Sequence, residues 1–252
     1  MNSFSINQNP SFTSRSPKIR DAQWVCQTVN SNFGHISTTK IRPKIEHLIK
    51  LNPDLFDKYL QNCNMRKLNR NKFNKKDKNL FKIFNWHNNL INKLKQTRQT
   101  WQAGSENNYR KLDCIFMQLK LDKLGNCGED ALVSEAILKM NGKNAFCAQL
   151  KVDGIDFDHS VCVLNPKDNN HNGKIHKKSI IIDSWLGIAD YAENVFLKYK
   201  NLYKDYFYFK SNSDIQLCSV SSCNLTPRNI EQLKSEYPEL IYRGKNFMKG
   251  YS

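Results

Sequence analysis

The sequence predicts an α+β protein, with helices in the first half and a helix followed by an antiparallel sheet in the second. Apolar residues recur at helical spacing from Pro43 to Lys120, as in Leu80, Phe81 and Phe84. After residue 140, they alternate with polar residues in short runs that turn-forming residues separate. This change from a helical to a two-residue period sets the expected fold class.

The N-terminal segment, residues 1–38, is rich in Ser and Asn, so we expect a polar, flexible tail. Trp24 and Val25 are the residues that would anchor part of it. The first 21 residues contain no apolar stretch, and no apolar run approaches the ~20 residues of a membrane helix. The sequence therefore predicts neither a secretory signal peptide nor a transmembrane segment.

Residues 39–118 are expected to form a basic helical lobe. The Asn52-Pro53 pair separates two apolar stripes, and residues 66–79 are expected to be an exposed linker. A further helix is expected from Tyr109 to Leu119, after a break at residues 103–105.

The positive charge of the chain is concentrated in this lobe. The 252 residues include 39 Lys and Arg against 23 Asp and Glu, a net charge of +16. Residues 40–100 hold 16 of the basic residues and four acidic ones, a local charge of +12. Two interpretations stay open. The charge is the solvated face of a helical lobe, or it binds nucleic acid or an anionic membrane, with Phe73, Phe81, Phe84 and Trp86 as interleaved aromatic residues.

Residues 119–252 are expected to form a second domain, which begins with a helix that stops at Asn141-Gly142. Three strands are expected next, at residues 146–152, 159–164 and 179–185, with turns at Asp153-Gly154 and residues 166–174. Helices are expected at residues 190–208 and after Thr226, which is a good N-cap before Pro227.

The residue that stands out chemically is Cys127, at the junction between the Gly125-Asn126 turn and the predicted helix. The free N–H groups and the positive partial charge of a helix N-terminus favour the thiolate, which is the reactive form of Cys. The same N–H groups are able to bind an oxyanion. Cys127 is therefore a candidate nucleophile, although a single Cys at a helix start is more often structural.

A nucleophilic Cys needs a base and a group that orients the base, and the strands supply candidates in His159 and Asp183. If the two strands pair as a hairpin, the residue numbers of any two opposed residues have the same sum. For His159 and Asp183 this sum is 342. The hairpin centre then falls at residue 171, inside the predicted turn. In that register Val161 opposes Ile181, and the Cβ atoms of His159 and Asp183 lie about 5 Å apart. Alone, each residue has an ordinary structural interpretation; together, they predict a Cys-His-Asp triad.

These segments also resemble papain-like cysteine proteases. Gly125-Asn126-Cys127 resembles their Gly-x-Cys turn, Asp158-His159-Ser160-Val161 their histidine motif, and Asp183-Ser184-Trp185 their Asn-Ser-Trp motif with Asp in place of Asn. The short spacing is closer to bacterial effector cysteine proteases and glutamine deamidases; transglutaminase-like enzymes and arylamine N-acetyltransferases share the triad order. The resemblance spans residues 120–190 and implies a papain-like or transglutaminase-like catalytic core in residues 119–252.

The sequence departs from this family at two points. His159 follows Cys127 by 32 residues, whereas the papain-like gap is about 130–150 residues. The family's oxyanion Gln lies six residues before the Cys, where this chain has Leu121, with Gln118 nearby. Gln118 and Asn126 are therefore candidate oxyanion donors beside the Cys127 backbone N–H. Asn126 fits equally well as the N-cap of a capping box with Glu129.

Trp185 completes the set of candidate site residues. Because it follows Asp183 by two positions, we expect it to cover the His159–Asp183 hydrogen bond and exclude water. It also has an ordinary interpretation as a core residue.

No metal or cofactor is predicted. The chain has no Walker loop and no GxGxxG motif, and its His171-x4-His176 and Cys218-x4-Cys223 spacings lack the CxxC pair of a typical zinc site. Its eight cysteines are too few for a disulfide scaffold of this length, so we expect mostly free thiols in a reducing compartment. That compartment is the cytoplasm or, if the effector resemblance holds, a host cytosol reached by a dedicated secretion system.

The function predicted from the sequence is a cysteine-dependent hydrolase that cleaves or modifies amide bonds of a protein substrate, with an effector protease preferred. A glutamine deamidase or transglutaminase-like acyltransferase uses the same acylation chemistry and stays open. A non-enzymatic protein that binds nucleic acid or an anionic membrane through the basic lobe is the alternative from a different class.

Overall fold

The computed structural model describes residues 16–34, 36–57, 75–103, 108–164, 177–202, 215–219 and 223–242. Within these ranges the helices are α1 (Pro17–Phe33), α2 (Thr38–Leu51), α4 (Lys75–Ala103), α5 (Asn108–Met117), α6 (Cys127–Met140), α7 (Ala192–Leu202) and α8 (Pro227–Glu236), with a π-helix (Gln118–Asp122) and a 3-10 helix (Pro238–Leu240). The strands are β1 (Ala145–Val152), β2 (Ile155–Leu164), β3 (Ile180–Asp183), β4 (Ile188–Tyr191) and β5 (Ile215–Ser219). The predicted α+β class is confirmed.

The strands form an antiparallel sheet in the order β4-β3-β2-β1-β5 within the described chain. Asp153 and Gly154 join β1 to β2 with φ angles of 53° and 78°, the left-handed backbone that a two-residue hairpin requires. This turn and the helix stop at Asn141-Gly142 are as predicted. β4 and β5 were not predicted as strands, because each is too short to display a clear alternation.

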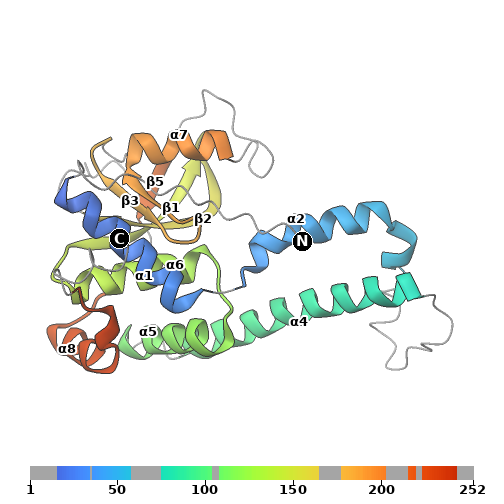
Figure 1. Ribbon diagram of the computed structural model, residues 1–252, viewed down its shortest axis with the longest axis horizontal. Coiled ribbons are helices and arrows are strands. Elements are labelled where there is room, and N and C mark those ends of the chain that lie inside the picture. The colour runs from blue at the N-terminus through green and yellow to red at the C-terminus, as the bar shows by residue number, and fades with distance from the viewer. Residues whose placement is uncertain are drawn as a thin grey trace, which may run out of the picture.

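Helices cover both faces of the sheet (Figure 1). One face packs on α1 and α6, and this core includes Cys162, Ile180 and Ile182 of the sheet. The other face is covered by α7, and its core includes Val161, Val163 and Ile181. Alternate residues of β2 and β3 therefore serve two separate cores, as the period of a strand requires.

The predicted polar tail is wrong for residues 17–33, which form α1 in the main core. Ser16 caps the helix by accepting from Ile19 N, and the buried face includes Ile19, Val25 and Phe33. The Ser and Asn content of the segment concealed this apolar stripe, of which only Trp24 and Val25 were recognised as anchors. The stripe buries against α6, β3 and β4.

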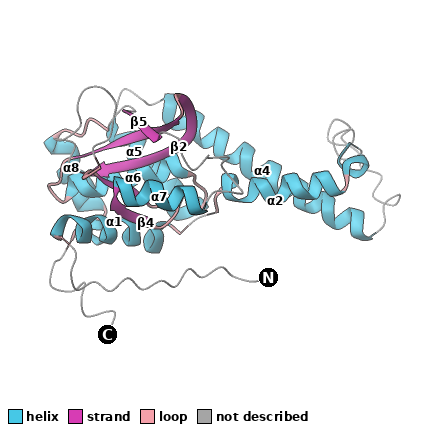
Figure 2. Cartoon of the chain, turned by 90° about the horizontal axis from the view of Figure 1, so that it is seen from above, coloured by secondary structure: helices cyan, strands magenta, loops and turns pink. Residues whose placement is uncertain are grey.

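The helices α2 and α4 lie side by side and extend away from the rest of the protein (Figures 1 and 2); we call this pair the arm. Its own small core joins Ile45 of α2 to Leu80, Phe81 and Phe84 of α4. The predicted break at Asn52 is present. Residues 75–79, predicted as part of a linker, begin α4, whereas residues 66–74 lie outside the described ranges.

The boundary predicted at residue 118 also differs from the structure. Leu112, Ile115 and Phe116 of α5 are fully buried in the main core, so α5 belongs with the sheet rather than with the arm. Among the described residues, no helix is long and apolar enough to span a membrane.

Candidate active site

Cys127 is the first residue of α6, and its side chain is 8% exposed. The preceding turn, residues 123–126, is held by the segment between α1 and α2: Ile36 N donates to Lys123 O over 2.8 Å, and Gly125 N donates to Ile36 O over 3.3 Å. These backbone bonds fix where the helix begins, and so they fix where the thiol lies.

The N-terminus of α6 is capped as the sequence suggested. Asn126 N donates to Oε2 of Glu129 over 2.9 Å, which is the Glu half of a capping box. Glu129 in turn accepts two hydrogen bonds from Arg98 of α4, at 2.7 and 2.8 Å. The arm is therefore bonded directly to the helix that carries Cys127.

The structure brings His159 and Asp183 together. Nε2 of His159 lies 2.7 Å from Oδ2 of Asp183, and the two side chains are 3% and 0% exposed. With Nε2 engaged by the carboxylate, Nδ1 is the ring nitrogen left for Cys127, whose side chain is one of the groups that raise the pKa of His159. The structure thus joins His159 directly to Asp183 and places Cys127 in the same buried cluster as Val161 and Trp185.

The register that led to this pair is nevertheless wrong. β2 and β3 pair Cys162 with Ile182 and Val163 with Ile181, so opposed residues sum to 344 and not to 342. A shift of two residues leaves every side chain on its predicted face. His159 and Asp183 consequently remain on one face as diagonal neighbours, within reach of an imidazole and a carboxylate.

Asp183 is held by further donors that sequence reasoning missed. Tyr199 of α7 donates its hydroxyl to Oδ2 over 2.6 Å, and Leu186 N donates to Oδ1 over 3.0 Å. Tyr199 is 1% exposed and its ring packs edge-on to that of His159, with centroids 5.7 Å apart. In the sequence Tyr199 was one of several apolar residues at helical spacing, and nothing distinguished its hydroxyl.

The surroundings of His159 favour its charged form. Burial acts first and lowers the pKa, but the Asp183 charge, the hydrogen bond to it and the Cys127 partner together raise the pKa of His159 from 6.5 to about 10. The imidazolium is thus the expected form at neutral pH. A cationic His beside a thiol is the arrangement that supports a thiolate–imidazolium pair.

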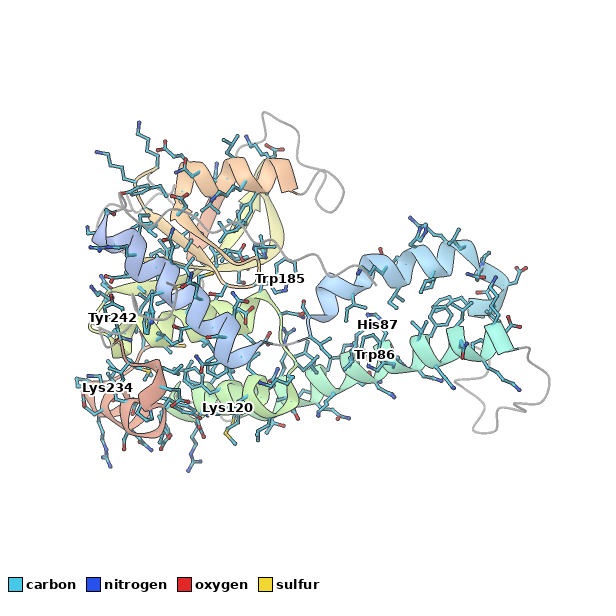
Figure 3. All side chains as sticks on the ribbon, viewed as in Figure 1. Trp86, His87, Lys120, Trp185, Lys234 and Tyr242 are labelled. Atoms are coloured by element: carbon cyan, nitrogen blue, oxygen red, sulfur yellow. The ribbon has the colours of Figure 1, made fainter. Side chains whose placement is uncertain are left out.

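Trp185 lies against this pair and is tied to the nucleophile turn. Its ring centroid is 5.3 Å from that of His159, and it is 6% exposed. Nε1 of Trp185 donates to Oγ of Ser37 over 2.8 Å, and Ser37 donates to Oδ1 of Asn126 over 2.9 Å. Ser37 immediately precedes α2, so Trp185 lies where the arm joins the body (Figure 3).

The two candidate oxyanion side chains have structural partners. Gln118 begins the π-helix, is 3% exposed, and donates Nε2 to Leu124 O over 2.8 Å, which supports the turn before Cys127. Asn126 has its amide orientation fixed by Ser37. Leu121, at the family's Gln position, is 69% exposed. An oxyanion role for Gln118 or Asn126 stays a prediction.

Other described cysteines lie in environments that suppress reactivity. Burial raises the pKa of Cys26 and Cys223 to about 12 and holds those of Cys147 and Cys162 well above the usual value. These four thiols therefore stay protonated at neutral pH. The structure describes the side chains of these four cysteines and of Cys114 and Cys127, and all six are free thiols.

Within the described ranges no group of three or more His, Cys, Asp or Glu side chains is arranged to hold a metal. His171 and His176, whose spacing does not predict a zinc site, lie outside those ranges.

Comparisons of this chain with protein families, with curated proteins and with solved structures gave no match. The geometry of the site therefore carries the functional interpretation.

Proposed function

We propose that this protein is a cysteine-dependent hydrolase of amide bonds, with Cys127 as nucleophile, His159 as general acid and base, and Asp183 as the residue that orients the imidazole. The observation that carries the proposal is the 2.7 Å contact from His159 Nε2 to Asp183 Oδ2 in a buried site where Cys127, at the start of α6, packs in the same cluster as Val161 and Trp185. Burial of charged groups is unfavourable unless they are paired, and such pairs are common at functional sites. A catalytic triad therefore explains the buried His159–Asp183 pair better than chance packing does.

The proposed reaction begins from the thiolate of Cys127 paired with the protonated imidazole of His159, which already holds the thiol proton. The thiolate attacks the carbonyl carbon of an amide, and the resulting oxyanion is stabilised by the N–H groups at the start of α6. His159 returns the proton to the leaving nitrogen as the C–N bond breaks, which leaves a thioester on Cys127. Water, deprotonated by His159, then attacks the thioester carbon, and the C–S bond breaks to release the acid and restore the thiolate–imidazolium pair.

The substrate class we favour is a protein, and the reaction peptide-bond cleavage by a papain-like core of the effector type. The resemblance of Asp183-Ser184-Trp185 and Gly125-Asn126-Cys127 to papain-like motifs supports this, as do the hydrogen bonds through Ser37 that link Trp185 to Asn126. Free thiols on the described cysteines support work in a reducing compartment, either the cytoplasm of the producing cell or a host cytosol reached by secretion.

The test is selective alkylation. Native protein is treated with iodoacetamide near neutral pH, and modified peptides are quantified by mass spectrometry. We expect Cys127 to react faster than every other thiol, including partly exposed Cys114, and His159→Ala to abolish the difference. If Cys127 reacts no faster than Cys114, the proposal fails. Cys114→Ala is the matched control for Cys127→Ala in all activity assays.

Trapping separates protease from deamidase. Cys127→Ala is used to capture a substrate from extracts, and wild-type protein is then incubated with that substrate. New peptide termini support the protease. Ammonia release, with a mass change of amide to acid and an intact chain, would replace the protease with a deamidase.

A second candidate function is binding of single-stranded nucleic acid by the arm. The specific observation is one face of α4 on which Lys78, Lys82 and Trp86 follow at four-residue spacing and are all exposed, Trp86 by 44%. Lysines attract phosphates and the indole offers a surface for base stacking. Figure 3 places Trp86 on the arm.

This second function is tested by titrating a short single-stranded oligonucleotide at several salt concentrations. We expect affinity to fall steeply with salt in the wild type and to be lost in a Lys78→Gln, Lys82→Gln, Trp86→Ala variant. Lys234→Gln, on α8, is the control that should bind normally. Absent or salt-insensitive binding of the oligonucleotide would reject this second function. Tight binding to phosphatidylserine vesicles in place of the oligonucleotide would assign the arm to membranes.

A further inference from the structure

The carboxylate that caps the nucleophile helix is buried close to the nucleophile. Glu129 lies two residues after Cys127 and is 2% exposed, and its Oε2 accepts from Asn126 N over 2.9 Å. This cap fixes the backbone from which the thiol projects. It also places a negative charge in the same first turn of α6 as Cys127, and a nearby like charge disfavours an anion.

Arg98 pairs with the Glu129 carboxylate through two hydrogen bonds. Its Nε lies 2.7 Å from Oε1 of Glu129 and its Nη2 lies 2.8 Å from Oε2. The planar guanidinium matches a carboxylate in this geometry, which fixes orientation as well as distance. The Arg98 side chain is 36% exposed, whereas that of Glu129 is 2% exposed, so the pair is screened by solvent mainly on its arginine side.

The pair belongs to a set of charged groups on the elements that form the site. β2 and β3 contribute His159 and Asp183, α6 contributes Glu129 and the buried Asp130, and α4 contributes Arg98. Three of these five groups are acidic and two are cationic, so loss of the arginine would increase the excess of negative charge in the set. Arg98 is the one member of this set that comes from the arm.

We propose that Arg98 is a positioning residue for the nucleophile: it pairs with Glu129 so that this carboxylate caps α6 without opposing the Cys127 thiolate. The arm is then a required part of the active site and not only an accessory binding element. This inference rests on the proposed function of Cys127, but it is measured on the charge environment of the thiol itself.

The experiment uses opposed charge changes in the full-length protein. The rate of Cys127 alkylation is measured across pH for wild type, Arg98→Gln, Glu129→Gln and the double variant. Arg98→Gln should raise the pH of half-maximal alkylation by about one unit, with about tenfold slower reaction at pH 7. Glu129→Gln should shift that pH downward, and the double variant should return close to wild type. Arg98→Lys should recover part of the rate.

Lys93→Gln is the matched control, because Lys93 lies on the same helix and forms an ion pair of 2.7 Å with Asp122 at the surface. Its alkylation profile should equal that of the wild type. Glu129→Gln retains an acceptor for Asn126 N, so it should fold even if Arg98→Gln does not, and its downward shift then decides the question.

A purely structural role for the ion pair predicts something different. In that case both single variants would lower the melting temperature, while the pH of half-maximal alkylation would stay unchanged or shift in the same direction; either result overturns the inference. Failure of the proposed function is distinguishable, because there wild-type Cys127 would react no faster than Cys114 whatever the variants do.

Discussion

Tyr199 and His159 share one oxygen of Asp183: the tyrosine hydroxyl donates to Oδ2 over 2.6 Å, and His159 Nε2 lies 2.7 Å from the same atom. Tyr199 comes from α7, which covers the sheet face that carries both other residues. The hydroxyl therefore fixes the carboxylate that fixes the imidazole.

We expect Tyr199→Phe to slow Cys127 alkylation at pH 7 about threefold to tenfold and to cost about 1–2 kcal/mol of folding free energy, because a buried charge-assisted hydrogen bond is lost. Alkylation kinetics and urea unfolding measure the two effects. Tyr191→Phe is the control, since Tyr191 contacts Ser16 and not Asp183. Equal alkylation rates in the two variants would contradict a role for Tyr199 at the site.

Asp183→Asn should change the pH dependence of stability. The pKa of His159 is raised to about 10 in the folded protein from 6.5. The stability that its charged form contributes is therefore complete below pH 6.5 and is lost as the pH rises to about 10. Without the carboxylate, burial lowers the pKa and this contribution disappears.

The measurement is the melting temperature of wild type and Asp183→Asn from pH 6 to about pH 10. The gap between them should be widest at low pH and should narrow on the alkaline side. Asp113→Asn, which changes a carboxylate that accepts from Tyr237, is the matched control. A gap that stays constant with pH would show that the carboxylate does not hold His159 in its charged form.

Ser37→Ala should loosen the nucleophile turn. The change removes the hydroxyl that accepts from Trp185 Nε1 and donates to Asn126 Oδ1, and it leaves two buried polar groups without this partner. We expect a loss of about 1–3 kcal/mol of stability and slower Cys127 alkylation. Ser31→Ala, at an exposed serine of α1, should change neither the stability nor the alkylation rate. If Ser37→Ala behaves like Ser31→Ala, the link from Trp185 through Ser37 to Asn126 is refuted.

Phe33→Ala should destabilise the fold more than any of these changes. Phe33 is 1% exposed and stacks on Phe116 of α5 with ring centroids 5.5 Å apart. Loss of such a buried ring costs about 3–5 kcal/mol through lost transfer energy and an unfilled cavity. Chemical denaturation tests this, with Leu197→Ala as control, because Leu197 is 58% exposed. A small effect would mean that α1 is dispensable.

Local patterns were sufficient for much of the fold. The Asn141-Gly142 stop, the Asp153-Gly154 turn and the Thr226-Pro227 start each depend on the backbone preferences of two neighbouring residues, so they could be predicted without tertiary information. Helix α1 was missed because its apolar stripe is diluted by polar residues, and only packing on α6 and the sheet reveals it.

The sequence by itself determined which residues carry the candidate chemistry and which face of the sheet each occupies. His159 and Asp183 lie on one face because side-chain direction follows a two-residue period. Their shared face was therefore predicted correctly although the predicted register was wrong by two residues. Tertiary structure decided the register itself, and it also decided the contacts made by Tyr199, Ser37 and Arg98. These partners lie far from the triad in sequence or are hidden in ordinary patterns, and only the packing of α7 and the arm on the sheet and α6 brings them to the site.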